Sequence, residues 1–158
     1  MSRIVPGFLF VLTASPALAQ SPPVSTVMAV AVEVQAGCSV AASPLLLSAQ
    51  QGRRGQSSAD ITIACGPDEP FTVSLDHGSH ADGGQRCAYD PVADRYVAYD
   101  IFRDPGRSRR WADGPDDVVS GMTNALGKAS LQAYGATPAH PDLRTGRYVD
   151  QVVVTVSF

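Results

Sequence analysis

The sequence predicts an all-β, immunoglobulin-like sandwich, and three observations support that fold class. No window carries apolar residues at helical spacing for about three turns, so helices are not expected. Short runs that alternate apolar and polar residues recur along the chain, with turn residues between them. The 14 glycines and 12 prolines are scattered throughout the 158 residues. About seven strand segments fit this pattern, which is typical of an antiparallel sandwich.

The first 19 residues are predicted to be a secretory signal peptide. Arg3 supplies a positive charge, residues 4–12 form a short apolar stretch, and Ala17 and Ala19 frame a small-residue cleavage site. Such a stretch is too short to anchor a protein in a membrane. We expect cleavage after Ala19 and export of residues 20–158.

The charge of the exported chain argues against nucleic acid as a partner. Without Arg3, 11 basic residues stand against 15 acidic residues, which gives a net charge of about −4. A protein that binds nucleic acid or an anionic membrane surface usually carries a basic patch. We therefore predict neither kind of partner.

The first alternating run covers residues 24–40 and is long for a single strand. It is expected to serve as two consecutive segments, which divide into an N-terminal extension over residues 20–32 and a domain over residues 33–158. One face of the extension carries a row of mostly apolar side chains: Val24, Thr26, Met28, Val30 and Val32. An ordinary first strand of the same domain is the alternative for this run.

The remaining strands follow in order, with polar or glycine-rich turns between them. The runs with alternating side chains are residues 59–65, 71–76, 85–90, 95–104, 129–139 and 148–158. In the last run, side chains at every second position share a face. One face of it carries Tyr148, Val152, Val154, Val156 and Phe158.

The three cysteines allow three different single disulfides. Export to an oxidising compartment makes one disulfide expected. Cys38 and Cys65 both stand at or beside strand ends, on the inward face of their runs, so we prefer this pair. It would close a loop of about 28 residues, worth about 3–4 kcal/mol in the chain-entropy model. Cys87 is then left over, and its place in a strand-like segment favours a buried thiol.

Two polar segments could form a site, and neither reading is favoured over a plain loop. His77 and His80, with Asp76 and Asp82, could be drawn as a metal site, but such residues are also common in hairpin loops. Arg103, Arg107, Arg109 and Arg110 surround Trp111 and could bind an anionic glycan or phosphate. Nearby aspartates make a solvated, charge-balanced hairpin tip the preferred interpretation.

No enzyme and no cofactor are predicted. The chain has no G-x-S-x-G nucleophile elbow, and glutamate occurs only at Glu33 and Glu69. Nothing in the sequence sets a serine beside a histidine in the way that a catalytic triad requires. The function is therefore expected to be structural or a binding function.

Several stretches, in order along the chain, resemble the spore coat protein U domain family, the subunits of archaic chaperone–usher pili. The stretches are "AGCSV", "ADITIAC", "FTVSLDHG", "VAYDIFRD", "LQAYGATPA" and the terminal "GRYVDQVVVTVSF". Each is weakly specific alone, and the ordered set is more specific. The resemblance covers nearly all of the exported chain.

The resemblance implies a pilin-type sandwich that lacks its final strand and is completed by another chain. A periplasmic pilus chaperone would fill the gap first. The extension of a neighbouring pilin subunit would then replace the chaperone at an outer-membrane usher, by β-strand addition. The expected donor residues are the row from Val24 to Val32, and the expected acceptor groove edge is Tyr148–Phe158. Such a subunit would pass through the periplasm to the cell surface.

A second function remains open at this stage. A monomeric secreted β-sandwich that binds a carbohydrate or another surface ligand would have the same strand pattern and signal peptide. It would differ in carrying a complete sheet of its own.

Overall fold

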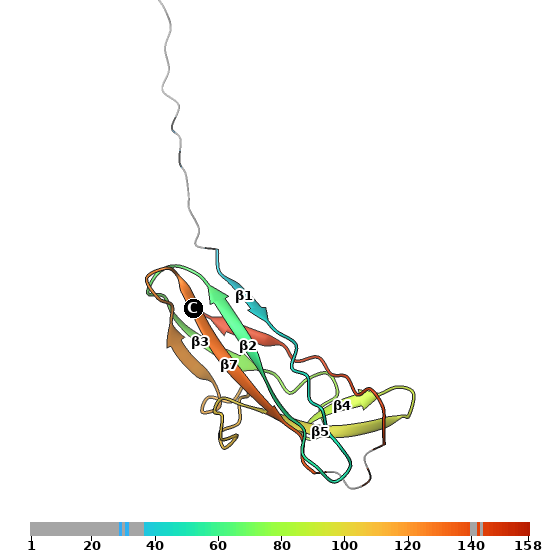
Figure 1. The fold of residues 1–158 in the computed structure, drawn as a ribbon. Helices are drawn as coiled ribbons and strands as arrows, with labels where there is room; N and C mark the ends of the chain where they lie inside the picture. The colour runs from blue at the N-terminus through green and yellow to red at the C-terminus, as the bar shows by residue number, and fades with distance from the viewer. Residues whose placement is uncertain (1–28, 30, 32–36, 140–141, 143) are drawn as a thin grey trace, which may run out of the picture. The chain divides into compact units, whose positions relative to one another are not determined.

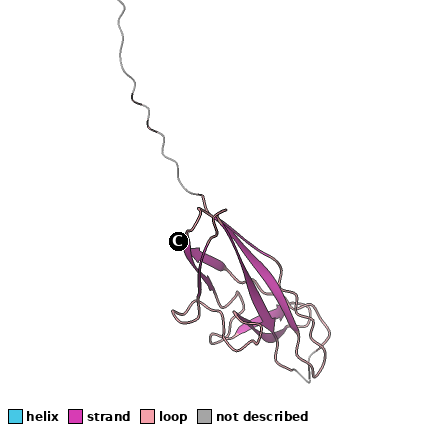
Figure 2. Ribbon diagram, turned by 60° about the vertical axis from the view of Figure 1, so that its left-hand side comes forward, coloured by secondary structure: helices cyan, strands magenta, loops and turns pink. Residues whose placement is uncertain are grey.

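A computed structural model describes residues 29, 31, 37–139, 142 and 144–158. The chain divides into two units, Met1–Val34 and Gln35–Phe158, and the fold below is that of the second unit. Its regular elements are all strands (Figure 2). Among the described residues, none belongs to a helix that could cross a bilayer. The predicted signal peptide and the five predicted donor residues lie outside the described residues.

Eight strands form two antiparallel sheets in the described part of the chain (Figure 1). One sheet has the order β1-β2-β7-β5-β4, and the other has the order β6-β3-β8. The strands are β1 (Ser39–Ala42), β2 (Gln56–Ala64), β3 (Pro70–Leu75), β4 (Arg86–Asp90), β5 (Arg95–Phe102), β6 (Val119–Met122), β7 (Lys128–Ala136) and β8 (Val154–Ser157). The all-β sandwich predicted from the sequence is therefore confirmed.

The alternating runs located five of the eight strands well, located β1 and β8 in part, and missed β6. Strands β2, β3, β4, β5 and β7 overlap the runs expected at their positions. β6 was not expected, because its residues carry a serine and a glycine and alternate weakly. Gly121 of β6 lies against the Phe71 ring, and a Cβ at this position would approach the ring to 2.7 Å, so glycine fits here. The last run, residues 148–158, forms a regular strand only as β8.

The core fills the space between the two sheets. It contains Ile61 and Ile63 of β2, Phe71, Val73 and Leu75 of β3, Tyr99 and Ile101 of β5, Ala133 of β7, and Trp111. The inward residues of β2 alternate with exposed ones, as a half-buried strand requires. Burial of these apolar side chains is the main term that stabilises the sandwich.

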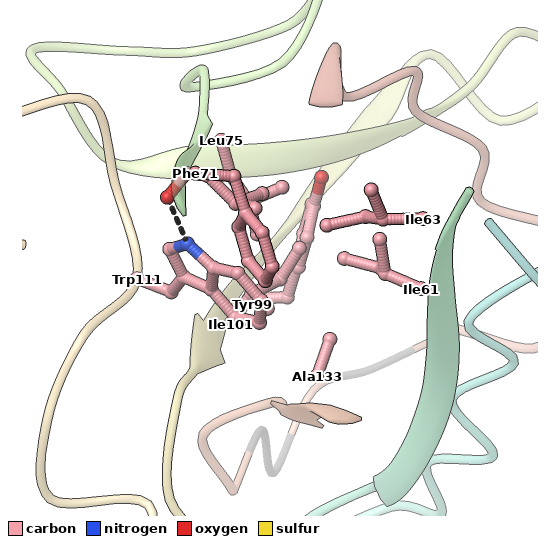
Figure 3. Packing of buried hydrophobic residues seen from close by; sticks show 9 residues of the cluster. Ile61, Ile63, Phe71, Leu75, Tyr99, Ile101, Trp111 and Ala133 are labelled. Carbon is pink, nitrogen blue, oxygen red and sulfur yellow. Dashed lines mark hydrogen bonds between the residues drawn. The ribbon is translucent and has the colours of Figure 1, made fainter. Parts of the chain in front are cut away.

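Trp111 belongs to the core although it stands in a loop between β5 and β6. Its side chain is fully buried among the residues shown in Figure 3. The indole N–H donates a hydrogen bond to the Val73 carbonyl at 3.0 Å, and the Trp111 backbone N–H donates to the Ile101 carbonyl at 2.8 Å. The loop therefore folds back over the sheets, which the sequence pattern did not indicate.

A disulfide joins Cys38 and Cys65, so the preferred pairing is confirmed. The register explains it, because Ser39 of β1 lies opposite Ala64 of β2. The two cysteines are the next residues outward on each strand, with Cα atoms 4.3 Å apart. Cys87 is a buried free thiol, as predicted. Burial raises the pKa of Cys87, which keeps it protonated and unreactive.

Candidate functional site

The candidate site is the edge of the three-stranded sheet formed by β8. In the described residues, β8 pairs with β3 and with no strand on its other side. The residues before β8 follow the same course. Val149 exchanges backbone hydrogen bonds with Tyr89, and the carbonyls of Gln151 and Val153 accept from Ser79 and Asp76 at 3.0 and 3.1 Å. The segment from Val149 to Ser157 is thus bonded along one edge.

The parity of these bonds tells which backbone groups are free. Along a strand, successive residues turn their N–H and C=O groups to opposite edges. Val149, Gln151 and Val153 use theirs toward the neighbouring segments. The backbone groups of Val152, Val154 and Val156 therefore point to the other edge, where the described chain has no strand. An edge of this kind is a template for pairing with another chain.

The same three valines turn their side chains toward the core. Val152, Val154 and Val156 are half-buried and pack against the core cluster. Phe158, at the end of the row, is 51% exposed. Tyr148, at the start, is half-buried, and its hydroxyl donates to the Arg144 carbonyl at 3.1 Å. The structure thus brings together three of the five residues expected at this edge. It leaves apolar surface partly uncovered beside free backbone groups.

The five-stranded sheet also ends in an edge strand, β1. It pairs with β2 alone, and all four of its residues are exposed, among them Val40. Leu45 and Leu47, which follow β1, are partly buried against the core cluster. Each sheet therefore has two edge strands that pair with one strand only in the described chain, β1 and β4 in one sheet and β6 and β8 in the other.

Asp150 is a residue of this edge that the sequence analysis missed. It has the same parity as the three valines, and only 3% of its side chain is exposed. Its Oδ2 accepts a hydrogen bond from the Tyr99 hydroxyl at 2.6 Å, and its Oδ1 lies 3.0 Å from His80 Nδ1. Burial, and then the bond to Asp150, raise the pKa of Tyr99. A charged residue in an apolar row is expected to turn its side chain to solvent. The burial of Asp150 is explained only by its partners, Tyr99 and His80.

The two histidines of the loop after β3 have different partners. His80 contacts Asp150, whereas His77 Nδ1 lies 3.6 Å from Asp113 Oδ1. Over the ranges that the structure describes, no three His, Cys, Asp or Glu side chains are grouped so as to hold a metal ion. The loop interpretation accounts for both histidines.

The arginines around Trp111 are largely engaged in holding the chain. Arg110 forms an ion pair with Asp100 at 2.8 Å. Arg107 donates to the Gly135 and Ser57 carbonyls and lies 5.9 Å from the Tyr134 ring centre. Arg103 donates to the Val118 carbonyl at 2.8 Å. The exposed Arg109 lines a shallow hollow of about 300 Å³ with Arg103 and the start of β6.

A family model described as the Spore Coat Protein U domain matches residues 24–155. The chain belongs to this family. The match covers β1 to β7, the disulfide and the first two residues of β8. No curated protein matches the chain.

Two solved structures that match this chain come from pilus assembly complexes, and the first of them has a similar fold. One is a chain of a chaperone–tip adhesion subunit pre-assembly complex from the archaic chaperone–usher Csu pili of Acinetobacter baumannii. It is 24% identical with a TM-score of 0.63, over 79% of this chain and 40% of that chain. A chain of a chaperone–tip adhesin complex in CFA/I fimbriae biogenesis is 12% identical with a TM-score of 0.48, over 75% and 41%. This chain thus spans about 40% of the length of those chains.

Proposed function

We propose that this Spore Coat Protein U domain is a structural subunit of a chaperone–usher type pilus or surface fibre, polymerised by donor-strand exchange. In that process an extended segment of one subunit pairs with the open sheet edge of the next. The observation that carries the proposal is the open edge of β8. There the free backbone groups and the half-buried side chains of Val152, Val154 and Val156 offer both the hydrogen bonds and the apolar contacts that strand addition uses.

The proposed partners follow from the hazard of such an edge. An exposed edge strand beside apolar surface promotes aggregation unless it is covered. A periplasmic pilus chaperone would cover it first, and a neighbouring pilin subunit would replace the chaperone at an outer-membrane usher. The subunit would accordingly be exported, pass through the periplasm and end at the cell surface. Similarity to a chain from a pilus assembly complex supports the fold that this role needs.

The proposed donor is the N-terminal extension of another copy or of a sister subunit. Residues 20–32 carry Val24, Thr26, Met28, Val30 and Val32 at alternate positions, so these side chains could enter one row of pockets. Their parity matches the two-residue spacing of the valines along β8. The chemistry is entirely non-covalent, and the proposal assigns no catalytic residue and no cofactor.

The test is the behaviour of the exported chain on gels without boiling. The complete mature chain is expected to give SDS-resistant ladders that collapse on boiling, because strand addition buries a long ladder of hydrogen bonds. A chain that lacks residues 20–32 should still bind a chaperone but form no ladder. Adding a synthetic peptide of residues 20–32 should convert it to an SDS-resistant one-to-one complex.

Two results would contradict the proposal. A monomeric complete chain that pairs with no peptide would favour the alternative, a secreted sandwich that binds a carbohydrate or another surface ligand. A shortened chain that unfolds, and that a chaperone does not recover, would show that residues 20–32 are an ordinary strand of their own domain. A peptide with Val30→Asp is the matched control, since a buried charge should prevent pairing.

A further inference from the structure

The residues just before β8 are held by the loop that follows β3. Asp76 contributes most of the contacts. Its backbone N–H donates to the Val153 carbonyl at 3.1 Å, and its Oδ1 accepts from the Val153 N–H at 2.9 Å and from the Gly78 N–H at 2.9 Å. Ser79 donates its backbone N–H to the Gln151 carbonyl at 3.0 Å. A side chain thus replaces a backbone carbonyl as the partner of Val153.

Asp150 joins this loop to the opposite sheet. Its Oδ1 accepts from the His80 backbone N–H at 3.2 Å and lies 3.0 Å from the His80 ring nitrogen. Since a carboxylate only accepts, that ring nitrogen carries the proton. Its Oδ2 accepts from Tyr99 of β5 at 2.6 Å. Asp76, Gly78, His80 and Asp150 are called the Asp150 clasp below.

Gly78 is required for the clasp to close. Its φ of +81° is a conformation that favours glycine, and a Cβ at this position would collide with the Asp150 carboxylate. Gly83 lies in the same loop, also at positive φ (+54°), yet a Cβ there would meet nothing within 4 Å. The two glycines therefore differ in the contact with Asp150 while sharing the need for a left-handed backbone.

We infer that the Asp150 clasp positions the open edge of β8 for an incoming strand. This inference rests on the function proposed above. Val152, the first of the three valines whose backbone groups point to the open edge, lies two residues after Asp150 and directly before Val153. Without the clasp, the Val149–Tyr89 pair and the hydrogen bond from Ser79 to Gln151 would be the remaining backbone anchors of residues 149–153 in the described chain. A template that is ordered before binding saves the entropy of ordering it on binding.

The test uses the chain that lacks residues 20–32, so that no neighbouring extension fills the edge, and a fluorescent peptide of residues 20–32, with association followed by anisotropy. Gly78→Ala and His80→Ala are expected to slow association about tenfold, within the range over which variants of one interface change their on-rates. Gly83→Ala should leave the rate within about twofold of the original. His80→Gln keeps a side-chain N–H and should recover part of the loss. Ile101→Val lowers Tm without touching the clasp and should leave the rate unchanged.

Amide hydrogen exchange, measured on the same proteins, separates the clasp from the proposed function. The amides of Val153 and His80, which donate to the Asp76 and Asp150 carboxylates, should exchange about tenfold faster in Gly78→Ala than in Gly83→Ala. Equal association rates and equal exchange rates in the two glycine variants would overturn the inference. So would equal association rates in His80→Ala and Ile101→Val, if the two variants have the same Tm. If the shortened chain without a further substitution captures no peptide, the proposed function fails, and exchange alone then decides whether the clasp orders this segment. If Gly78→Ala does not fold, the His80→Ala and His80→Gln pair decides it.

Discussion

At the scale of single residues, Arg86 shows how a charged side chain can be a core component. It is fully buried in β4 and donates to the carbonyls of Leu75, Asp76 and Trp111 at 2.6 to 3.1 Å. Burial lowers the pKa of Arg86. The guanidinium thus joins β4, the end of β3 and the Trp111 loop, whose carbonyls would otherwise lack donors. The Arg86 side chain therefore supplies hydrogen bonds that a neighbouring strand would supply in a regular sheet.

Replacing Arg86 should cost more stability than replacing another arginine. Arg86→Leu leaves three carbonyls without these donors, and we expect the free energy of unfolding to fall by at least about 3 kcal/mol. Exposed Arg109→Leu should change it by less than about 0.5 kcal/mol. Urea unfolding followed by tryptophan fluorescence measures both variants. Similar small losses for the two would contradict the role given to Arg86.

Tyr99 should make the protein sensitive to alkaline pH. Its folded-state pKa is raised by burial and by the bond to Asp150, so its stabilising contribution is complete below the unfolded pKa and is lost above it. Between pH 9 and pH 11, the free energy of unfolding should fall about 1.4 kcal/mol further in the original protein than in Tyr99→Phe. Parallel stability curves for the two proteins over this range would refute the prediction.

At the scale of elements, β8 shows that an edge strand can be understood only when the direction of each residue's backbone N–H and C=O groups is known. The run of residues 148–158 indicates one apolar face, but it does not reveal which backbone groups are free. The backbone bonds of Gln151 and Val153 decide that, and the register with Ser74 opposite Thr155 continues the same parity along β8. Thr155 turns its N–H to β3, and Val154 turns its N–H to the open edge.

Proline at these two neighbouring positions should therefore have different effects. Thr155→Pro removes a ladder hydrogen bond and should lower the free energy of unfolding by about 3 kcal/mol or more. Val154→Pro removes a donor from the open edge, where proline is tolerated, and should cost less than about 1.5 kcal/mol. Val154→Pro should nevertheless abolish pairing with the peptide of residues 20–32. Equal stability losses would show that the parity is wrong.

At the scale of the whole molecule, the disulfide fixes the beginning of the domain to its largest sheet. Cys38 lies directly before β1, an edge strand with four exposed residues that pairs with β2 alone. Such a strand has little buried surface to hold it in place. The covalent bond to Cys65 therefore supplies order where packing supplies least.

Removing the disulfide should destabilise the domain without changing its sheets. Cys38→Ser with Cys65→Ser is expected to lower the free energy of unfolding by about 3–4 kcal/mol, through the added entropy of the unfolded chain. Cys87→Ser, which leaves the disulfide in place, is the matched control and should lose less. Thermal unfolding under non-reducing conditions measures both. An unchanged Tm after removal of the disulfide would contradict this account.

The sequence by itself determined the fold class, the positions of most strands, the family resemblance and the preferred cysteine pair. These rest on local signals, because alternation and turn residues report on a strand without reference to its neighbours. Only the tertiary structure decided the burial of Trp111, Arg86 and Asp150 and the open edge of β8. Their environments are made by residues such as Val73, Leu75 and Tyr99, which are distant in sequence. A pattern that repeats every two residues gives a side chain's face, and pairing between distant strands sets the partner and the free edge.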